Sequence, residues 1–527
     1  MSVVESPRQV APEVGRALAP LAWKPLSLIA AAVAVPLLLL LGRYGYDGDE
    51  LYFIAAGRHL DWGYADQPPL VPLLAWLMDS LFPGSVYALR LPSLLVIVAG
   101  VFLTAQVARE MRGERRAQII AAAAYAIAFA SFGNLLQTDS FNAILWLVII
   151  WQVIRWVRLR QDGVTGRAAD MSLLWAGVTT AVALQAKYLV PVLWVAIAIG
   201  VLLSGPRDML RRPLLWAGAG IAVVTALPGL IWQVANDLPQ LKHARMVGEQ
   251  NDQVLGGRVM FLPNTLLMAG IGVGLVLFCY GTWKLLRSPH LRDYRFFGWA
   301  TLVMIVFFMI TNGRFTYMAA IFPVIFAAAA VQMQLGEPAK WWRWTISWPV
   351  FALSALLVVP SLALLPRESV ERTTAKISAG QQISEDDFED QLAVGWTDWA
   401  QQITWPVLAD SVASTYRALP EETRRKTVIV ATEYTAAAAL EVLGPERGLP
   451  EQVYSFSVGY GYLATPPADA GTFLFVGWND NLAQLFGHVE KVGVVQGNAG
   501  ELTNQALMLC TGPRESMATL WPKLRYP

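Results

Sequence analysis

Long apolar segments constrain this chain more than any other feature, because a helix needs about 20 mostly apolar residues to cross the hydrocarbon core of a bilayer. Such segments fill the first 365 residues. They lie at 26–42, 89–108, 117–133, 139–157, 171–186, 188–204, 214–235, 263–286, 296–311, 316–334 and 344–365. The composition agrees, since 55% of the residues are hydrophobic and only 15% are charged. The sequence therefore predicts a polytopic α-helical membrane protein with about eleven transmembrane helices.

Basic residues are concentrated in every second loop between these segments. Lysine and arginine in short loops favour the cytoplasmic side of the membrane. The first 24 residues are polar and precede an apolar run without a small-residue cleavage site, so we interpret that run as a retained first helix. The basic loops are 109–116, 155–167, 207–212, 284–295 and 340–343. This pattern predicts a multi-pass cell membrane protein with a cytoplasmic N-terminus and an extracytoplasmic C-terminus.

The composition changes after residue 365, where polar and apolar residues mix and no segment is long enough to span a bilayer. Short β-like runs alternate there with a helix-like segment at 435–443. The runs are 427–431, 472–476, 492–495 and 506–510. We therefore expect a transmembrane domain at 1–365 and an extracytoplasmic α/β domain at 366–527.

The sequence argues against several classes of protein and several kinds of site. The net charge of +1 gives no general attraction to nucleic acid. Four scattered histidines and two cysteines, Cys279 and Cys510, make a zinc site or a disulfide improbable. Gly459-Tyr-Gly461 lacks the third glycine and the context of a nucleotide-binding loop. We expect no required cofactor, although an acidic pair can bind a divalent cation.

The first outer loop, residues 43–88, carries the most informative polar residues. Its first motif reads Tyr46-Asp-Gly-Asp-Glu-Leu-Tyr-Phe53, and Asp49 and Glu50 stand where a helix would begin. Carboxylates at that position often cap a helix or offset its dipole. A carboxylate near the membrane surface can also act as a general base toward a hydroxyl. The local sequence leaves both interpretations open.

The second motif of this loop reads Leu60-Asp-Trp-Gly-Tyr-Ala-Asp-Gln-Pro-Pro-Leu70, and an amphipathic segment at 70–81 follows it. We expect that segment to lie along the membrane interface. Together the two motifs resemble glycosyltransferase family 39, which includes protein O-mannosyltransferases and their bacterial relatives; lipid A aminoarabinose transferase is similar in fold. The resemblance covers the membrane region. It implies the GT-C fold and transfer of a hexosyl or pentosyl group from a polyprenyl-phosphate donor to an outer acceptor.

The resemblance also implies roles for residues of the loop. Asp49 matches the catalytic carboxylate, Glu50 would support it, and Asp66 would orient the acceptor or the donor sugar. We place Tyr52 and Tyr64 among the substrate-binding residues. Many relatives carry lysine close to the proline pair, where this chain has Gln67, so another cation must bind the donor phosphate.

Candidate cations on the outer side are Lys187, Arg314 and Arg90. Basic side chains near the end of a span also snorkel to the interface without binding a ligand. We favour snorkelling for Arg90, and phosphate binding for Lys187 and Arg314, because these two lie in very short outer hairpins. Asp139 stands at the outer end of a span, where an unpaired charge is costly. Pairing with Lys187 and a direct role in catalysis are both open for it.

Two further segments offer contacts to a substrate. The outer loop 236–263 is long enough to act as a lid, and we include its His243 among the substrate-binding residues, although a lone loop histidine is more often solvated. The stretch 454–462 is rich in aromatic residues and glycine, which suit stacking on a sugar and packing on the membrane domain equally well.

The function that best fits these features is an inverting glycosyltransferase bound to the lipid bilayer. Its acceptor would be a cell-wall glycan, a glycolipid or a protein hydroxyl. A transporter or flippase of lipid-linked sugars, or a non-catalytic glycan-binding membrane protein, is the alternative. A transporter usually has ionisable groups near the midplane of the membrane, whereas the acids here gather at the outer surface.

Overall fold

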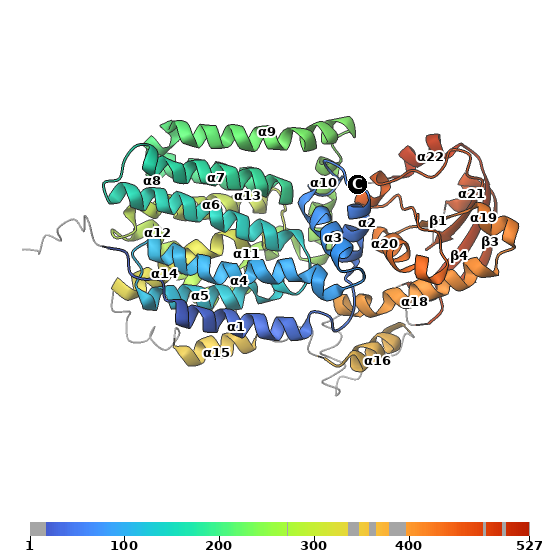
Figure 1. The fold of residues 1–527 in the computed structure, drawn as a ribbon, viewed down its shortest axis with the longest axis horizontal. Coiled ribbons are helices and arrows are strands. Elements are labelled where there is room, and N and C mark those ends of the chain that lie inside the picture. Colours follow the sequence, from blue (N-terminus) through green and yellow to red (C-terminus); the bar gives the residue numbers. More distant parts are fainter. Residues whose placement is uncertain are drawn as a thin grey trace, which may run out of the picture.

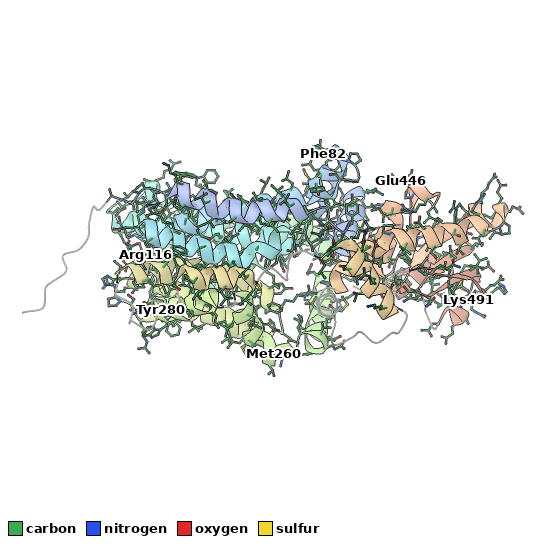
Figure 2. The ribbon with its side chains drawn as sticks, turned by 90° about the horizontal axis from the view of Figure 1, so that it is seen from below. Phe82, Arg116, Met260, Tyr280, Glu446 and Lys491 are labelled. Atoms are coloured by element: carbon green, nitrogen blue, oxygen red, sulfur yellow. The ribbon has the colours of Figure 1, made fainter. Side chains whose placement is uncertain are left out.

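The computed structural model describes residues 17–270, 272–335, 347–357, 365–378, 397–477, 481–497 and 502–525. A helical bundle and a C-terminal α/β region lie end to end, and two short helices of the first outer loop, α2 (Gly48–Arg58) and α3 (Leu70–Leu81), lie where they meet (Figure 1). In a second view, Arg116 lies in the bundle and Lys491 far from it in the α/β region (Figure 2).

Apolar helices form the bundle, and its core is a continuous cluster of buried side chains from many of them. The segment Phe315–Leu335, which ends in α14, is the most enclosed of the span-length segments described, with 89% of its span-length window buried. Glycine allows two helices to approach closely, since a Cβ atom at Gly177 would lie 2.3 Å from the Cα atom of Gly218. The bundle helices are α1 (Trp23–Leu40), α4 (Val86–Glu110), α5 (Arg115–Phe129), α6 (Thr138–Gln161), α7 (Arg167–Ala186), α8 (Val190–Ser204), α9 (Pro213–Ala235), α12 (Val273–Arg287), α13 (Arg295–Ile310), α14 (Phe322–Leu335) and α15 (Trp348–Leu356).

The structure confirms a multi-span helical protein, but fewer helices than eleven have the length and composition of a span. Within the described ranges, seven helical segments qualify, or up to eight if α11 (Gly257–Met268) and α12 form one bent span. Helix α8 has 15 residues and α7 is less apolar, so neither qualifies alone. Of the predicted run 344–365, α15 is described, whereas residues 344–346 and 358–364 lie outside the described ranges.

The segments outside the bundle are more helical than the sequence suggested. Helix α3 has the predicted bounds, and its exposed Leu73, Trp76 and Leu81 give it an apolar surface suited to the membrane interface. Phe82, which follows α3, lies at the edge of the molecule between the bundle and the α/β region (Figure 2). The predicted loop 236–263 instead contains α10 (Pro239–Val254) and the start of α11.

The C-terminal region holds a four-stranded sheet in the order β1-β2-β4-β3, with β1 parallel to β2 and the other pairs antiparallel. The predicted strands 427–431 and 472–476 match β1 and β2. Strand β3 begins six residues before the predicted run at 492. The prediction missed its first half because those residues form an exposed edge rich in polar residues. The elements are α16 (Arg367–Ser378), α18 (Thr397–Ala418), α19 (Glu421–Lys426), β1 (Thr427–Ala431), α20 (Tyr434–Leu443), β2 (Thr472–Val476), α21 (Leu482–Leu485), β3 (Phe486–Val494), β4 (Ala506–Pro513) and α22 (Met517–Leu524).

Helices α2 and α20 join the two parts of the molecule. Apolar residues of both helices belong to one buried cluster. At one end of this contact a Cβ atom at Gly48 would lie 2.8 Å from Cγ2 of Thr435, and at the other end Arg58 donates to the carbonyl of Glu441 at 3.1 Å. The helices therefore run parallel, and their N-termini lie side by side at one place.

Candidate active site

Helix α2 begins with a capping arrangement that orients its acidic residues. The Asp47 side chain accepts a hydrogen bond from the backbone N–H of Asp49 at 2.9 Å, and Glu50 accepts one from the backbone N–H of Asp47 at 2.9 Å. Asp47 and Glu50 thus satisfy backbone donors of the first turn. The side chain of Asp49 takes no part in this cap and is left for other contacts.

Glu50 forms a buried ion pair with Arg90 of α4. The Nε of Arg90 lies 2.8 Å from Oε1 of Glu50 and its Nη2 lies 2.7 Å from Oε2, and the two side chains are 2% and 0% exposed. Arg90 also donates to the backbone carbonyls of Leu41 and Gly45, while Leu136 N–H donates to Glu50. The prediction that Arg90 snorkels is therefore wrong, because a buried carboxylate binds it inside the protein. Glu50 can affect Asp49 by fixing the start of α2.

Asp49 makes its side-chain contact with the C-terminal region. The hydroxyl of Tyr434, the first residue of α20, donates a hydrogen bond to Oδ1 of Asp49 at 2.7 Å. The same Tyr434 ring packs edge-on against Tyr52 of α2, with the ring centroids 5.3 Å apart. Asp49 keeps access to solvent, yet surrounding protein removes much of the water near its carboxylate, and this desolvation raises its pKa. The hydrogen bond from Tyr434 and the charge of Arg314 oppose that rise.

Asp66 and Tyr52 lie beside this pair. The Tyr52 hydroxyl donates to Oδ1 of Asp66 at 2.7 Å, and burial raises the pKa of Asp66 to about 6. A Cβ atom at Gly459 would lie 1.9 Å from the Tyr52 hydroxyl and 2.4 Å from Oδ1 of Asp66, so only glycine fits there. Tyr64 is directed elsewhere, since its buried hydroxyl donates to the Ala56 carbonyl at 3.0 Å and supports the loop.

The predicted cations lie at the same end of the bundle but differ in their partners. Lys187 forms an ion pair with Asp139, which is one of the two alternatives expected for that aspartate, and lies 4.5 Å from the centre of the Tyr317 ring. Arg314 is exposed, and within the described ranges it has no ion pair or hydrogen bond of its side chain. Its charge acts on Asp49, Asp139 and Lys187, which places it among them.

Helix α10 closes another side of this group and carries His243. The turn before Arg314 holds α10, because Asn312 donates to the Gly248 carbonyl at 2.6 Å and Asn251 donates to the Asn312 carbonyl at 2.7 Å. Burial, together with the charges of Arg314 and Lys187, lowers the pKa of His243 to about 4. His243 is therefore neutral at pH 7, and its buried Nδ1 has no partner in the described part of the chain.

Sequence reasoning singled out the stretch 454–462, which contains Gly459, but did not predict the contact of Tyr434 with Asp49. Tyr434 and Gly459 touch residues of the first outer loop, and Tyr434 is 385 positions from Asp49 in the chain. Nothing in their local sequence distinguishes them from other residues that pack between two domains.

Gln67 is buried, and neither atom of its amide has a partner among the described residues. Over the same ranges, no cluster of three or more His, Cys, Asp or Glu residues is placed to bind a metal.

Comparisons with known proteins bear on the class and the fold. Residues 66–232 match the family model described as dolichyl-phosphate-mannose-protein mannosyltransferase. No curated protein matches the sequence. The structure is similar to ArnT from Cupriavidus metallidurans in the apo state, with a TM-score of 0.59 and 16% identity over 95% of this chain and 99% of that one. For ArnT bound to undecaprenyl phosphate, the TM-score is 0.57 and the identity 16%, over 94% of this chain and 100% of that one.

At this low identity the likeness to ArnT establishes the fold, which extends over both the bundle and the α/β region. The family match includes Asp66 and the proline pair, which carried the resemblance in the sequence, and extends to α9. It confirms that resemblance. The chain is thus a membrane glycosyltransferase with the GT-C fold of ArnT, and its residues 66–232 match the dolichyl-phosphate-mannose-protein mannosyltransferase family.

Proposed function

We propose that this protein transfers a sugar, with inversion, from a polyprenyl-phosphate donor to a hydroxyl group of an acceptor on the side of the membrane where the α/β region lies. One observation carries the proposal: an accessible carboxylate, Asp49, and Arg314, a cation with no partner in the described part of the chain, meet at one end of the bundle. Attack by a hydroxyl group on a sugar phosphate requires two groups. A carboxylate accepts the proton of the hydroxyl, and a cation binds the phosphate. The ArnT structure with undecaprenyl phosphate supports a lipid-phosphate donor for this fold.

Asp49 is the proposed general base. Its raised pKa makes it a stronger proton acceptor than an ordinary aspartate, although it still has to be ionised to act. As it removes the proton from the acceptor hydroxyl, the acceptor oxygen bonds to the anomeric carbon. The bond from that carbon to the phosphate oxygen breaks, and the polyprenyl phosphate leaves with the electron pair. Asp66, held by Tyr52 close to Asp49, is the proposed binding residue for a hydroxyl of one of the substrates.

Arg314 is the proposed phosphate-binding residue. A phosphate leaving group gains negative charge in the transition state, and a guanidinium fixed beside it stabilises that charge. Lys187 already neutralises Asp139, so its charge is less available than that of Arg314. Neutral His243 is placed to donate or accept a hydrogen bond beside them. With these cations present we propose that no metal ion is required.

The proposal also includes the orientation of the protein in the membrane and the class of the sugar acceptor. The basic loops at the other end of the bundle favour the cytoplasm, so the site and the α/β region would lie outside it. The acceptor would be a cell-wall glycan, a glycolipid or a protein hydroxyl. A donor embedded in the membrane explains why such an enzyme needs a helical bundle.

Replacing Arg314 with glutamine tests the donor site. We expect the affinity for polyprenyl phosphate to fall about 10- to 100-fold, because one charged hydrogen-bond donor contributes roughly 1.5–3 kcal/mol. The measurement is binding of undecaprenyl phosphate to the purified full-length protein, followed by the KM for a radiolabelled polyprenyl-phosphate sugar. Arg245→Gln, which removes an exposed charge from α10, is the matched control. Equal loss of affinity in both variants would contradict the assignment of Arg314.

Replacing Tyr434 with phenylalanine tests how the α/β region acts on the base. The hydrogen bond from Tyr434 lowers the pKa of Asp49, so its removal should raise that pKa further. Because the base must be ionised, the acidic limb of kcat/KM should move to higher pH, and kcat at pH 7 should fall about tenfold for one lost hydrogen bond of about 1.4 kcal/mol. Tyr416→Phe removes a comparable hydrogen bond, to the Arg424 carbonyl, within the same region. An unchanged pH profile in Tyr434→Phe would remove Tyr434 from this role.

A further inference from the structure

A second candidate site lies between α6 and α7, far from Asp49. A cavity of about 270 Å³ is lined there by Gln152, Arg155, Ala168, Met171, Ser172 and Trp175. Asp139 and Lys187 pair at the active-site ends of the same two helices. Arg155 is 16 residues beyond Asp139 in α6, which corresponds to about 24 Å along a helix. The cavity is therefore close to the opposite face of the membrane.

Several arginines of this face pair with acidic residues, whereas Arg155 has no acidic partner in the described part of the chain. Arg158 pairs with Glu110 and Asp162, and three others also lie next to a carboxylate. These three are Arg112, Arg160 and Arg212. Over the described ranges, Arg155 has no ion pair or hydrogen bond of its side chain, and its Nε is buried without an acceptor. Its guanidinium lies 5.8 Å from the centre of the Trp151 ring.

An arginine in that position requires an anion as its partner. Charged groups within a membrane-embedded bundle are costly unless they are paired, and the Nε of Arg155 is enclosed by protein without an acceptor among the described residues. The other polar groups that line the cavity belong to glutamine, serine and tryptophan, and all three can donate a hydrogen bond. No acidic residue lines it. A phosphate group matches this set of donors.

The location of the cavity indicates where the phosphate comes from. Its Trp175 is 53% exposed, and Ala168 and Val182, seven residues before and after, are exposed as well. Residues spaced by seven share one face of a helix, so this face of α7 is open to the lipid. Tryptophan at such a position is typical of the membrane interface. We propose that the cavity binds the phosphate of an anionic membrane phospholipid, with the acyl chains along the exposed face of α7.

The proposal does not depend on the transfer reaction and is tested by lipid binding to the full-length protein. The probe is phosphatidylglycerol, titrated against delipidated wild-type protein in detergent and counted by native mass spectrometry. We expect Arg155→Gln to weaken the tightest binding event at least fivefold. Arg167→Gln, an exposed arginine at the start of α7 next to the cavity, should weaken it less than twofold. Equal losses in both variants would reduce the effect to general attraction by surface charge and overturn the proposal.

A second variant keeps the test independent of the charge. Ala168→Leu places a larger side chain in the lining of the cavity while preserving every arginine. We expect it to displace the same bound phosphatidylglycerol, and a variant with wild-type lipid binding would contradict the assigned location. Inorganic phosphate gives the last comparison. If millimolar phosphate removes the lipid as well as Arg155→Gln does, the site recognises a soluble anion and the lipid assignment fails.

Discussion

The Asp49→Asn variant should lose sugar transfer almost completely, with kcat reduced about 10²- to 10⁴-fold, while it still binds polyprenyl phosphate. Asparagine has nearly the shape of aspartate and can accept the hydrogen bond from Tyr434, so the packing of α2 against α20 should persist. It cannot accept a proton from the acceptor hydroxyl. The measurement is transfer of radiolabelled sugar from polyprenyl-phosphate donors, with a membrane extract as the source of acceptor.

A matched control for this variant is Glu249→Gln, which neutralises an exposed acid on α10 and should leave transfer unchanged. Full transfer by Asp49→Asn would remove Asp49 as the base and with it the proposed mechanism. This outcome is distinct from failure of the Tyr434 prediction, because Tyr434→Phe can behave as wild type while Asp49→Asn is inactive. In that case Asp49 remains the base and the α/β region has no part in setting its pKa.

The second large effect is expected on stability. Arg90→Met should lower the free energy of unfolding by about 3–5 kcal/mol, because it leaves the carboxylate of Glu50 buried without its partner. It also removes the donors that bind the carbonyls of Leu41 and Gly45, which fix the chain before α2. Denaturant or thermal unfolding of the purified protein in detergent measures the loss.

The double variant Arg90→Met with Glu50→Leu separates the two contributions. Removing both charges should restore the part of the stability lost to the unpaired carboxylate, whereas the cost of taking the acceptor from the N–H groups of Asp47 and Leu136 remains. Arg425→Met, which breaks an exposed ion pair with Glu421 in α19, should change stability by less than about 1 kcal/mol. If the single and double variants are equally unstable, the unpaired charge of Glu50 is not the cause.

Much of the fold could be predicted because its signals are local. Apolar length identified helices of the bundle, since each span must satisfy its own backbone hydrogen bonds in lipid. Short runs rich in β-branched and aromatic residues located β1 and β2, and the proline pair located the start of α3. Local signals were weaker for β3, whose exposed polar edge hides the strand, and for α7 and α8, which are helices of the bundle without the length and composition of a span.

The sequence by itself determined that this is a membrane-embedded helical protein with an acidic first loop, because hydrophobic length and residue type act over short stretches of chain. Only the tertiary structure determined which of the charged side chains lie next to one another. It buried Arg90 against Glu50, paired Lys187 with Asp139, and brought Tyr434 to Asp49 across 385 positions, and it gave Arg314 no partner among the described residues. Contacts of this kind depend on the packing of separate helices and of two regions of the molecule, and no local pattern of residues encodes them.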